Sequence, residues 1–321
     1  MSEKTSDPVC LSGNPPRGLK GLAACRPQLF GSICAVFATL IWSFNFLFGR
    51  ALADAIQPMT LVTLRGFLAV LLFTPFAFGR FRRDWTAIRA HLPFFALAGF
   101  IGITIPNTCI YTAAHTSEAL NLSIIAISTP LFVLILARIF FCEALSRTRI
   151  FGLAVIICGI MLLLSRGNLA VLMALNFQKG DLIMFGNVFG FATYTVMMRK
   201  TPKGVSSLSI MYVLLIFAAV FAAPGAIWEH LNGAQIHFSW KLAGGLLYTA
   251  AGASILSYFT WNLAVSYAGS ARTSIIYYLL PVFSGLEAAF FLGEPITLVH
   301  ILSMALIVSG LFIAIHVKKT V

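Results

Sequence analysis

The chain has 321 residues, of which 59% are hydrophobic and 10% are charged, and its mean hydropathy is +0.92. These proportions exclude a soluble globular protein and predict a membrane protein with several spans. The formal net charge of +12 does not indicate a nucleic-acid partner, because the basic residues cluster in particular loops between apolar runs.

The first segment, residues 1–29, contains four prolines and four Lys or Arg residues and predicts a disordered cytoplasmic tail. The apolar run that follows is longer than the core of a signal peptide, so we expect it to stay in the mature protein. Long continuous apolar runs are typical of transmembrane helices rather than of β-barrel strands. We expect ten spans, at about residues 30–48, 59–78, 92–113, 118–139, 150–165, 181–198, 205–227, 241–265, 271–292 and 298–316.

The distribution of Lys and Arg outside these spans predicts the orientation of the chain. If the N-terminus faces the cytoplasm, the inside segments carry 17 of these residues and the outside segments carry 4. Both termini are therefore expected in the cytoplasm, in a multi-pass protein of the cell inner (plasma) membrane. The same bias explains the basic net charge.

One stretch of the sequence occurs twice. Residues 123–159 and 274–310 are identical at 12 of 37 positions, including a proline, a glutamate and a glycine in one register: Pro130 with Pro281, Glu143 with Glu294, and Gly159 with Gly310. Each copy has five spans, an odd number, so the second copy enters the membrane from the opposite side. We therefore expect an all-α integral membrane protein whose ten transmembrane helices form two inverted five-helix repeats, 30–165 and 181–317.

Several short motifs occur at matching places in the two halves of the chain and in its first two spans. Trp42-Ser43-Phe44-Asn45 lies in the first span, Arg65 in the second, and spans four and nine each carry a proline followed thirteen residues later by a glutamate. Over about residues 30–317 the chain resembles the drug/metabolite transporter superfamily, in its ten-helix EamA-type branch. This resemblance implies a carrier of small organic solutes, often an exporter of amino acids or related metabolites. Inverted repeats are the architecture of transporters that work by alternating access.

Polar side chains at membrane depth are costly, so they indicate which helices face a cavity. In the repeat register, Asn107 and Tyr111 correspond to Tyr258 and Asn262, so each half presents one Asn and one Tyr on one helix face. Hydrogen bonding between packed spans is the alternative use of such side chains. The residues predicted to bind substrate are Asn45, Asn107, Tyr111, Asn187, Tyr194, Tyr258, Trp261, Asn262, Tyr278 and Glu287.

Glu287 is a carboxylate predicted inside a span. Its counterpart in the first half is Leu136, so the fold does not require an acidic residue at this position. A buried carboxylate is strongly disfavoured unless it has a use or a partner. Our hypothesis is that Glu287 receives an ammonium group of the substrate or carries a coupling proton. The structural alternative is an ion pair with Arg65 or another cation.

Six residues are predicted to have gating or structural roles: Arg65, Pro130, Glu143, Arg272, Pro281 and Glu294. Arg65 is expected near the outer surface, where it could meet a substrate carboxylate or extend to the lipid headgroups. The two prolines are expected within their spans, where each removes a backbone hydrogen bond and could form a hinge.

The predicted function is a secondary transporter, with export the preferred direction, for a small polar or zwitterionic metabolite such as an amino acid. The partners are the small-molecule substrate, the lipid bilayer and possible coupling protons; we expect no metal, no cofactor and no nucleic acid, in a monomer or homodimer. The chain has no G-x-x-x-x-G-K-[ST] motif and no metal-type cysteine spacing. The alternatives are a lipid translocase of the same fold and a membrane-embedded lipid-modifying enzyme, although the six histidines do not cluster by spacing.

Overall fold

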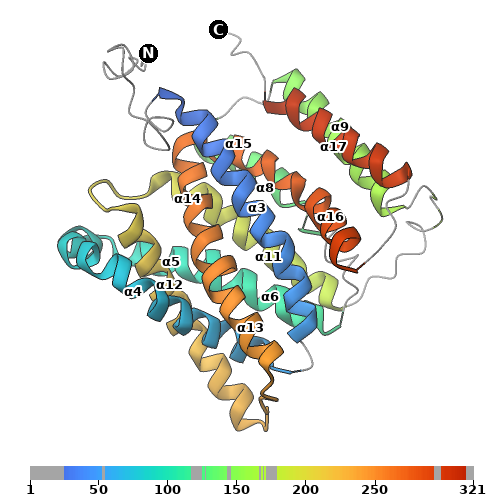
Figure 1. The fold of residues 1–321 in the computed structure, drawn as a ribbon. Helices are drawn as coiled ribbons and strands as arrows, with labels where there is room; N and C mark the ends of the chain where they lie inside the picture. The colour runs from blue at the N-terminus through green and yellow to red at the C-terminus, as the bar shows by residue number, and fades with distance from the viewer. Residues whose placement is uncertain are drawn as a thin grey trace.

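The computed structural model describes residues 25–52, 55–116, 125–126, 128–142, 146–165, 168, 170, 179–292 and 298–315, and the ordered elements of this part are all helical (Figure 1). The prediction of a helical membrane protein is thereby confirmed. Among the described residues, six segments are long and apolar enough to cross a membrane: Pro27–Asn45, Pro58–Ala90, Leu92–Ala114, Ser207–Leu231, Trp240–Ala268 and Leu298–Ile315. The ten spans expected from the sequence stay a prediction.

The helices lie at the places where the apolar runs predict them. In the first half they are α3 (Pro27–Leu52), α4 (Pro58–Ala90), α5 (Leu92–Gly99), the π-helical η1 (Phe100–Thr104), α6 (Ile105–Ala114), α8 (Thr129–Phe141) and α9 (Arg147–Leu164). In the second half they are α11 (Lys179–Met197), the 3-10 turn η2 (Met198–Lys200), α12 (Ser207–Leu231), α13 (Trp240–Tyr248), the π-helical η3 (Thr249–Leu256), α14 (Ser257–Ala268), α15 (Ser270–Ile276), the 3-10 turn η4 (Tyr277–Leu279), α16 (Leu280–Leu292) and α17 (Leu298–Ile315).

Helix α4 is longer than the span predicted at 59–78, because its polar end continues the helix and binds a neighbour. At that end the Asp84 carboxylate accepts hydrogen bonds from the Ser206 amide (2.9 Å) and the Ser209 hydroxyl (2.7 Å) at the start of α12. At the other end of α4, the Glu229 carboxylate of α12 accepts from the Met59 and Thr60 amides at 2.9 and 2.8 Å. Because the first amides of a helix lack partners within the helix, each carboxylate satisfies donors that would otherwise stay unbonded. Helices α4 and α12 are thus an antiparallel pair tied at both ends.

Helices α9 and α17 form a second close pair, at one side of the molecule (Figure 1). Glycines permit this approach: a Cβ built on Gly159 would lie 3.0 Å from the Ile307 nitrogen, and a Cβ built on Gly310 would lie 2.8 Å from the Ile156 nitrogen. Without a hydrophobic driving force in lipid, such close backbone contact is a main source of helix association. The pair therefore depends on the absence of side chains at Gly159 and Gly310.

The central helices α3, α6, α11 and α14 pack in the pairs α3–α14 and α6–α11. An aromatic-rich cluster of buried side chains fills the space around them and includes Trp42, Phe191, Tyr194, Trp261 and Tyr277. A separate apolar cluster closes the end of the bundle where α3 finishes and α4 begins. Its members are Leu52, Ile56, Leu61, Val62, Tyr111, Ala222 and Leu242.

The two repeated prolines occupy helix starts rather than the middle of uninterrupted helices. Pro130 lies in the first turn of α8, where a missing amide donor costs nothing. Pro281 is the second residue of α16 and follows the 3-10 turn η4, so the backbone changes its winding just before it. Pro130 therefore does not interrupt the interior of α8, and its role as a hinge stays a prediction. Glu143 and Glu294 lie outside the described residues.

We expect Gly310→Ala to lower the melting temperature of the purified protein, because the added methyl group would lie 2.7 Å from the Gly152 carbonyl oxygen. Relieving such a contact costs about 1–3 kcal/mol. Thermal unfolding in detergent measures the change. Gly79→Ala is the matched control, since no atom lies within 4 Å of its added Cβ. Equal melting temperatures for the two variants would contradict the packing described.

Candidate functional site

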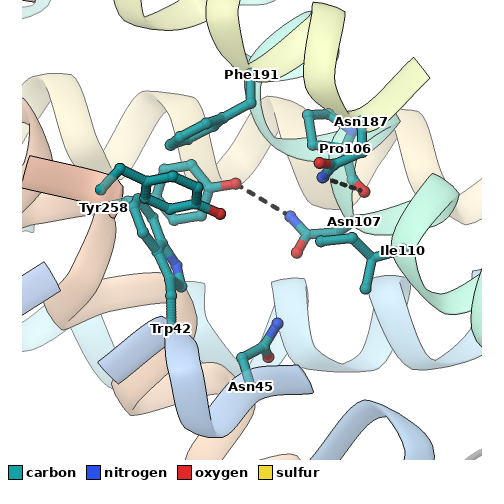
Figure 2. A pocket seen from close by; sticks show the side chains of 9 residues that line it. Trp42, Asn45, Pro106, Asn107, Ile110, Asn187, Phe191 and Tyr258 are labelled. Carbon is teal, nitrogen blue, oxygen red and sulfur yellow. Dashed lines mark hydrogen bonds between the residues drawn. The ribbon is translucent and has the colours of Figure 1, made fainter. Parts of the chain in front are cut away.

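A small cavity lies at the centre of the bundle, where α3, α6, α11, α14 and η4 meet. Its volume is about 30 Å³, which is enough for about one water molecule. None of the described side chains that line it is charged. They are Trp42, Asn45, Pro106, Asn107, Ile110, Asn187, Phe191, Tyr258 and Tyr277 (Figure 2).

One wall of the cavity is aromatic. The Trp42 ring packs edge-on against Phe191 and Tyr258, with ring centroids 5.1 Å apart in each case. The indole Nε1 of Trp42 donates to the Ala253 carbonyl at 3.2 Å, inside the π-helical segment η3. The aromatic wall is therefore held by edge-on packing between the rings and by the hydrogen bond from Trp42 to the π-helical backbone of η3.

The polar wall begins at Pro106, whose missing amide leaves the Gly102 carbonyl without its partner four residues later. The Tyr258 hydroxyl donates to that carbonyl at 3.1 Å, and Tyr258 in turn accepts from the Asn107 Nδ2 at 3.3 Å (Figure 2). Asn187 donates to the Pro106 carbonyl at 3.1 Å. A proline and a π-helical turn thus create the acceptors that orient the amides and hydroxyl of the site.

Arg65 lies directly behind this polar wall and is only 2% exposed. Its Nε and Nη2 donate to the Ser254 hydroxyl at 2.9 and 2.7 Å. Its Nη1 donates to the Asn107 Oδ1 at 3.0 Å and also to the Tyr111 hydroxyl. Because Arg65 is buried and donates to these three side chains, it does not extend to the lipid headgroups in this structure. Its location towards the outer side of the membrane stays a prediction.

Two tyrosine–asparagine hydrogen bonds lie on either side of the cavity. Tyr111 of α6 donates to the Asn45 Oδ1 of α3 at 3.1 Å, on the side of Arg65. Tyr194 of α11 donates to the Asn262 Oδ1 of α14 at 2.7 Å. We call these the Asn45–Tyr111 latch and the Tyr194–Asn262 latch.

Beyond the Tyr194–Asn262 latch lies a larger depression of about 450 Å³, which we call the vestibule. It is formed at the end of the bundle where α3 begins and α14 finishes. The Asn262 Nδ2 is buried and has no hydrogen-bond partner. The vestibule is lined by Gln28, Met198, Arg199, Thr201, Ser207, Ile210, Asn262, Val265, Ser266, Tyr267, Ala268 and Gly269.

Of the residues predicted to bind substrate, Asn45, Asn107, Asn187 and Tyr258 line the cavity. Tyr111, Tyr194 and Asn262 form the latches, and Trp261 is buried with its indole donating to Thr195 at 3.1 Å. Tyr278 packs in the apolar cluster that includes Cys34, Leu134 and Ile275, while its neighbour Tyr277 reaches the cavity.

Glu287 lies outside the cavity, on α16, where its carboxylate accepts a hydrogen bond from the Ser43 hydroxyl. It is 9% exposed. Glu287 is bonded to Ser43, whereas Arg65 is bonded to neutral side chains, so the structural alternative of a Glu287–Arg65 ion pair is not observed. Arg272 is also remote, since it donates to Ser32 and Gln28 of α3, each at 3.1 Å.

The residues predicted to bind substrate did not include Trp42, Phe191, Tyr277 or Ser254. Trp42 belongs to the first-span motif and lies one helical turn before Asn45, and Phe191 lies one turn after Asn187. Helical spacing from the predicted asparagines could therefore have found both. Ser254 had no such signal. Among the described residues, no group of three His, Cys, Asp or Glu side chains could hold a metal ion.

Comparison with known proteins agrees with the membrane architecture. A model described as the EamA-like transporter family matches residues 29–165 and again residues 178–315. A protein named "Uncharacterized transporter YyaM" from Bacillus subtilis is 24% identical over 227 residues, 71% of this chain and 74% of that one. A protein named "Probable amino-acid metabolite efflux pump" from Salmonella typhimurium is 24% identical over 300 residues, 89% of this chain and 96% of that one. A solved crystal structure, 17% identical, shares the fold with a TM-score of 0.72 over 89% of this chain and 96% of the other.

We expect Tyr111→Phe to destabilise the protein more than Tyr194→Phe. Both changes delete one latch, but the first also removes an acceptor from the charged Nη1 of Arg65. Hydrogen bonds to charged groups contribute about 1.5–3 kcal/mol, against about 0.5–1.5 kcal/mol for neutral pairs. Thermal melts of the two variants in one detergent test the order, and a larger loss for Tyr194→Phe would contradict it.

Proposed function

Since the chain belongs to the EamA-like transporter family, we propose that it is a secondary transporter that exports a small polar or zwitterionic metabolite, such as an amino acid or a related compound. The observation that carries this proposal is the central cavity of amides and aromatic rings with one latch on each side. The efflux-pump name of the Salmonella typhimurium relative supports the solute class and the direction. The family match confirms the resemblance drawn from the motifs.

The proposal includes ten transmembrane helices in two inverted repeats, 30–165 and 181–317. Asn107 and Tyr258 are counterparts at a shift of 151 residues, and they are hydrogen-bonded to each other. A contact between a residue and its own counterpart is expected where a two-fold axis passes between them. The cavity that they line would then lie on that axis, at the interface of the repeats, where such transporters place their substrate.

Two further features support the same symmetry. Gly159 approaches Ile307 and Gly310 approaches Ile156, which is the reciprocal pattern of an interface between identical surfaces. The π-helical segments also correspond, because η1 (Phe100–Thr104) shifted by 151 residues falls within η3 (Thr249–Leu256).

The two latches are counterparts as well. At the shift of 149 residues that relates the first spans, Asn45 corresponds to Tyr194, and at 151 Tyr111 corresponds to Asn262. The same pair of helices in each half therefore carries the same bond with the two residue types exchanged. In the proposed mechanism one latch opens while the other stays closed, so that the cavity meets one compartment at a time.

The central cavity is contracted in this structure, as expected for a step of the cycle in which both latches are closed. A cavity of about 30 Å³ is far below the roughly 300–1,000 Å³ typical of small-molecule sites, whereas the vestibule is in that range. With both termini in the cytoplasm, as the Lys and Arg bias favours, the vestibule opens to the cytoplasm. A cytoplasmic solute would enter it and separate the Tyr194–Asn262 latch.

Purified protein in proteoliposomes should exchange a radiolabelled amino acid or related metabolite across the membrane in a counterflow assay against a panel of such solutes. Asn187 lines the cavity, so Asn187→Ala removes an amide that a bound solute would contact. The variant should therefore reduce exchange of any solute that the wild-type protein transports. Exposed Lys203→Ala is the control, and it should transport normally. Lipid scrambling without solute exchange would replace the proposal with a lipid translocase.

Glu287 is proposed to carry a coupling proton rather than to bind the substrate, because it lies outside the cavity. Glu287→Gln should therefore retain solute exchange at equal pH and lose its response to an imposed pH gradient, since the amide cannot exchange a proton. Transport is measured with and without the gradient. Glu229→Gln, whose carboxylate binds backbone amides, should keep the response; an unchanged response in Glu287→Gln would exclude the proton role.

Cysteine labelling tests the orientation. In a background without native cysteines, Ser266→Cys in the vestibule should react with an impermeant maleimide only in inside-out vesicles. Gln235→Cys, exposed between α12 and α13, should react only in right-side-out vesicles. The reverse pattern would place both termini outside.

A further inference from the structure

We infer that Arg65 is the recognition group for a carboxylate of the transported solute, so that the substrate class is carboxylate-bearing metabolites. This inference rests on the proposed transport function and names the solute class that the same site would select. The sequence left open whether Arg65 meets a substrate carboxylate or has a gating or structural role, and the contacts of Arg65 favour the first.

The first argument is charge. The Arg65 guanidinium is positively charged at any physiological pH, and its side chain is 2% exposed. Its hydrogen-bond partners are the neutral side chains of Ser254, Asn107 and Tyr111. No carboxylate of the described residues lies within ion-pair distance of it, since the ion pair found in this part of the chain joins Arg83 and Asp84. A buried cation without a counter-ion is strongly disfavoured, so the position favours binding of an anion.

The second argument is geometry. The Asn107 Oδ1 and the Tyr111 hydroxyl both accept from the same Nη1 atom of Arg65. Asn107 also lines the cavity, so its amide is the layer between the guanidinium and the solute space. A carboxylate in the cavity can reach Nη1 by displacing this neutral oxygen, and charge-assisted hydrogen bonds are roughly twice as strong as the neutral bonds they replace.

The third argument is the approach to the cavity. The described residues that line the vestibule include Arg199 and no acidic side chain. At its inner end the buried Asn262 Nδ2 is a donor without a partner, and a carboxylate oxygen is a suitable acceptor for it. The vestibule therefore offers an anionic group the Asn262 Nδ2 as a donor on the way to the cavity.

The aromatic wall is also compatible with a zwitterionic solute. The rings of Trp42, Phe191 and Tyr258 lie together on one side of the cavity (Figure 2), which Tyr277 also lines. Aromatic rings attract ammonium groups. An ammonium group is thus compatible with the site, but the carboxylate is the group that the buried charge requires.

The test uses matched probes in which either the carboxylate or the amino group of one amino acid is changed. For each of alanine, leucine and phenylalanine, the amino acid, its primary amide and the acid lacking the amino group are compared by thermal stabilisation of the purified protein and by inhibition of counterflow. A ligand that binds the folded state raises its melting temperature. We expect stabilisation by at least one amino acid or simple acid, and at least tenfold weaker binding of the matching amide.

The variants separate recognition from structure. Arg65→Gln should weaken carboxylate binding about 10- to 100-fold, as loss of charged hydrogen bonds predicts, and Arg65→Lys should recover part of it. Asn107→Asp places an internal carboxylate next to Arg65 and should abolish the response to added carboxylates. Arg80→Gln removes an exposed charge from the same helix and should leave the probe response unchanged.

The outcomes distinguish this inference from the proposed function. Transport of amides or amines as readily as acids by the wild-type protein would overturn the inference and leave the transporter intact. The same holds for an unchanged acid preference in Arg65→Gln. If Arg65→Gln fails to fold, the wild-type comparison of acids with amides still decides. Absence of exchange for every neutral, cationic and anionic solute would overturn the proposed function itself, and absence of stabilisation by every carboxylate probe would overturn the inference.

Discussion

The interior of this protein is organised around the hydrogen bond between Asn107 and Tyr258. Each residue reaches outwards from that contact: Asn107 accepts from Arg65, and Tyr258 donates to the Gly102 carbonyl that Pro106 leaves free. In a bilayer, polar groups must find partners within the protein, because lipid offers none. A single central contact therefore fixes the orientation of the cavity wall, of the buried cation and of the irregular backbone around them.

The packing at the periphery uses a different principle from the packing at the centre. Helices α9 and α17 meet through glycines, and α4 and α12 are tied at their ends by Asp84 and Glu229. Neither pair supplies a lining residue to the central cavity among those described. Arg65 of α4 is nevertheless bonded to Asn107 of the cavity wall, so the α4–α12 pair contacts the site from behind.

The two latches are alike in their residue types but not in their surroundings. The Asn45–Tyr111 latch is backed by the guanidinium of Arg65 and by the apolar cluster that contains Leu52 and Leu61. The Tyr194–Asn262 latch borders the vestibule and leaves a donor unbonded. The charged Arg65 therefore lies beside the Asn45–Tyr111 latch, across the cavity from the vestibule.

The sequence by itself determined that this is a helical membrane protein, because that depends on hydrophobic length. It also predicts a repeated unit and its register from residue types that recur at a fixed spacing. It also identified Asn45, Asn107, Asn187 and Tyr258, since amides and hydroxyls inside apolar runs need partners. Only the tertiary structure decided that Tyr277 rather than Tyr278 reaches the cavity, because the 3-10 turn η4 sets the rotation of the helix at these two residues. The burial of Arg65 likewise depends on η3 and α6 covering its face of α4, and residues distant in the sequence make that cover. Helical periodicity gives the faces of a helix, but only packing shows which face another helix covers.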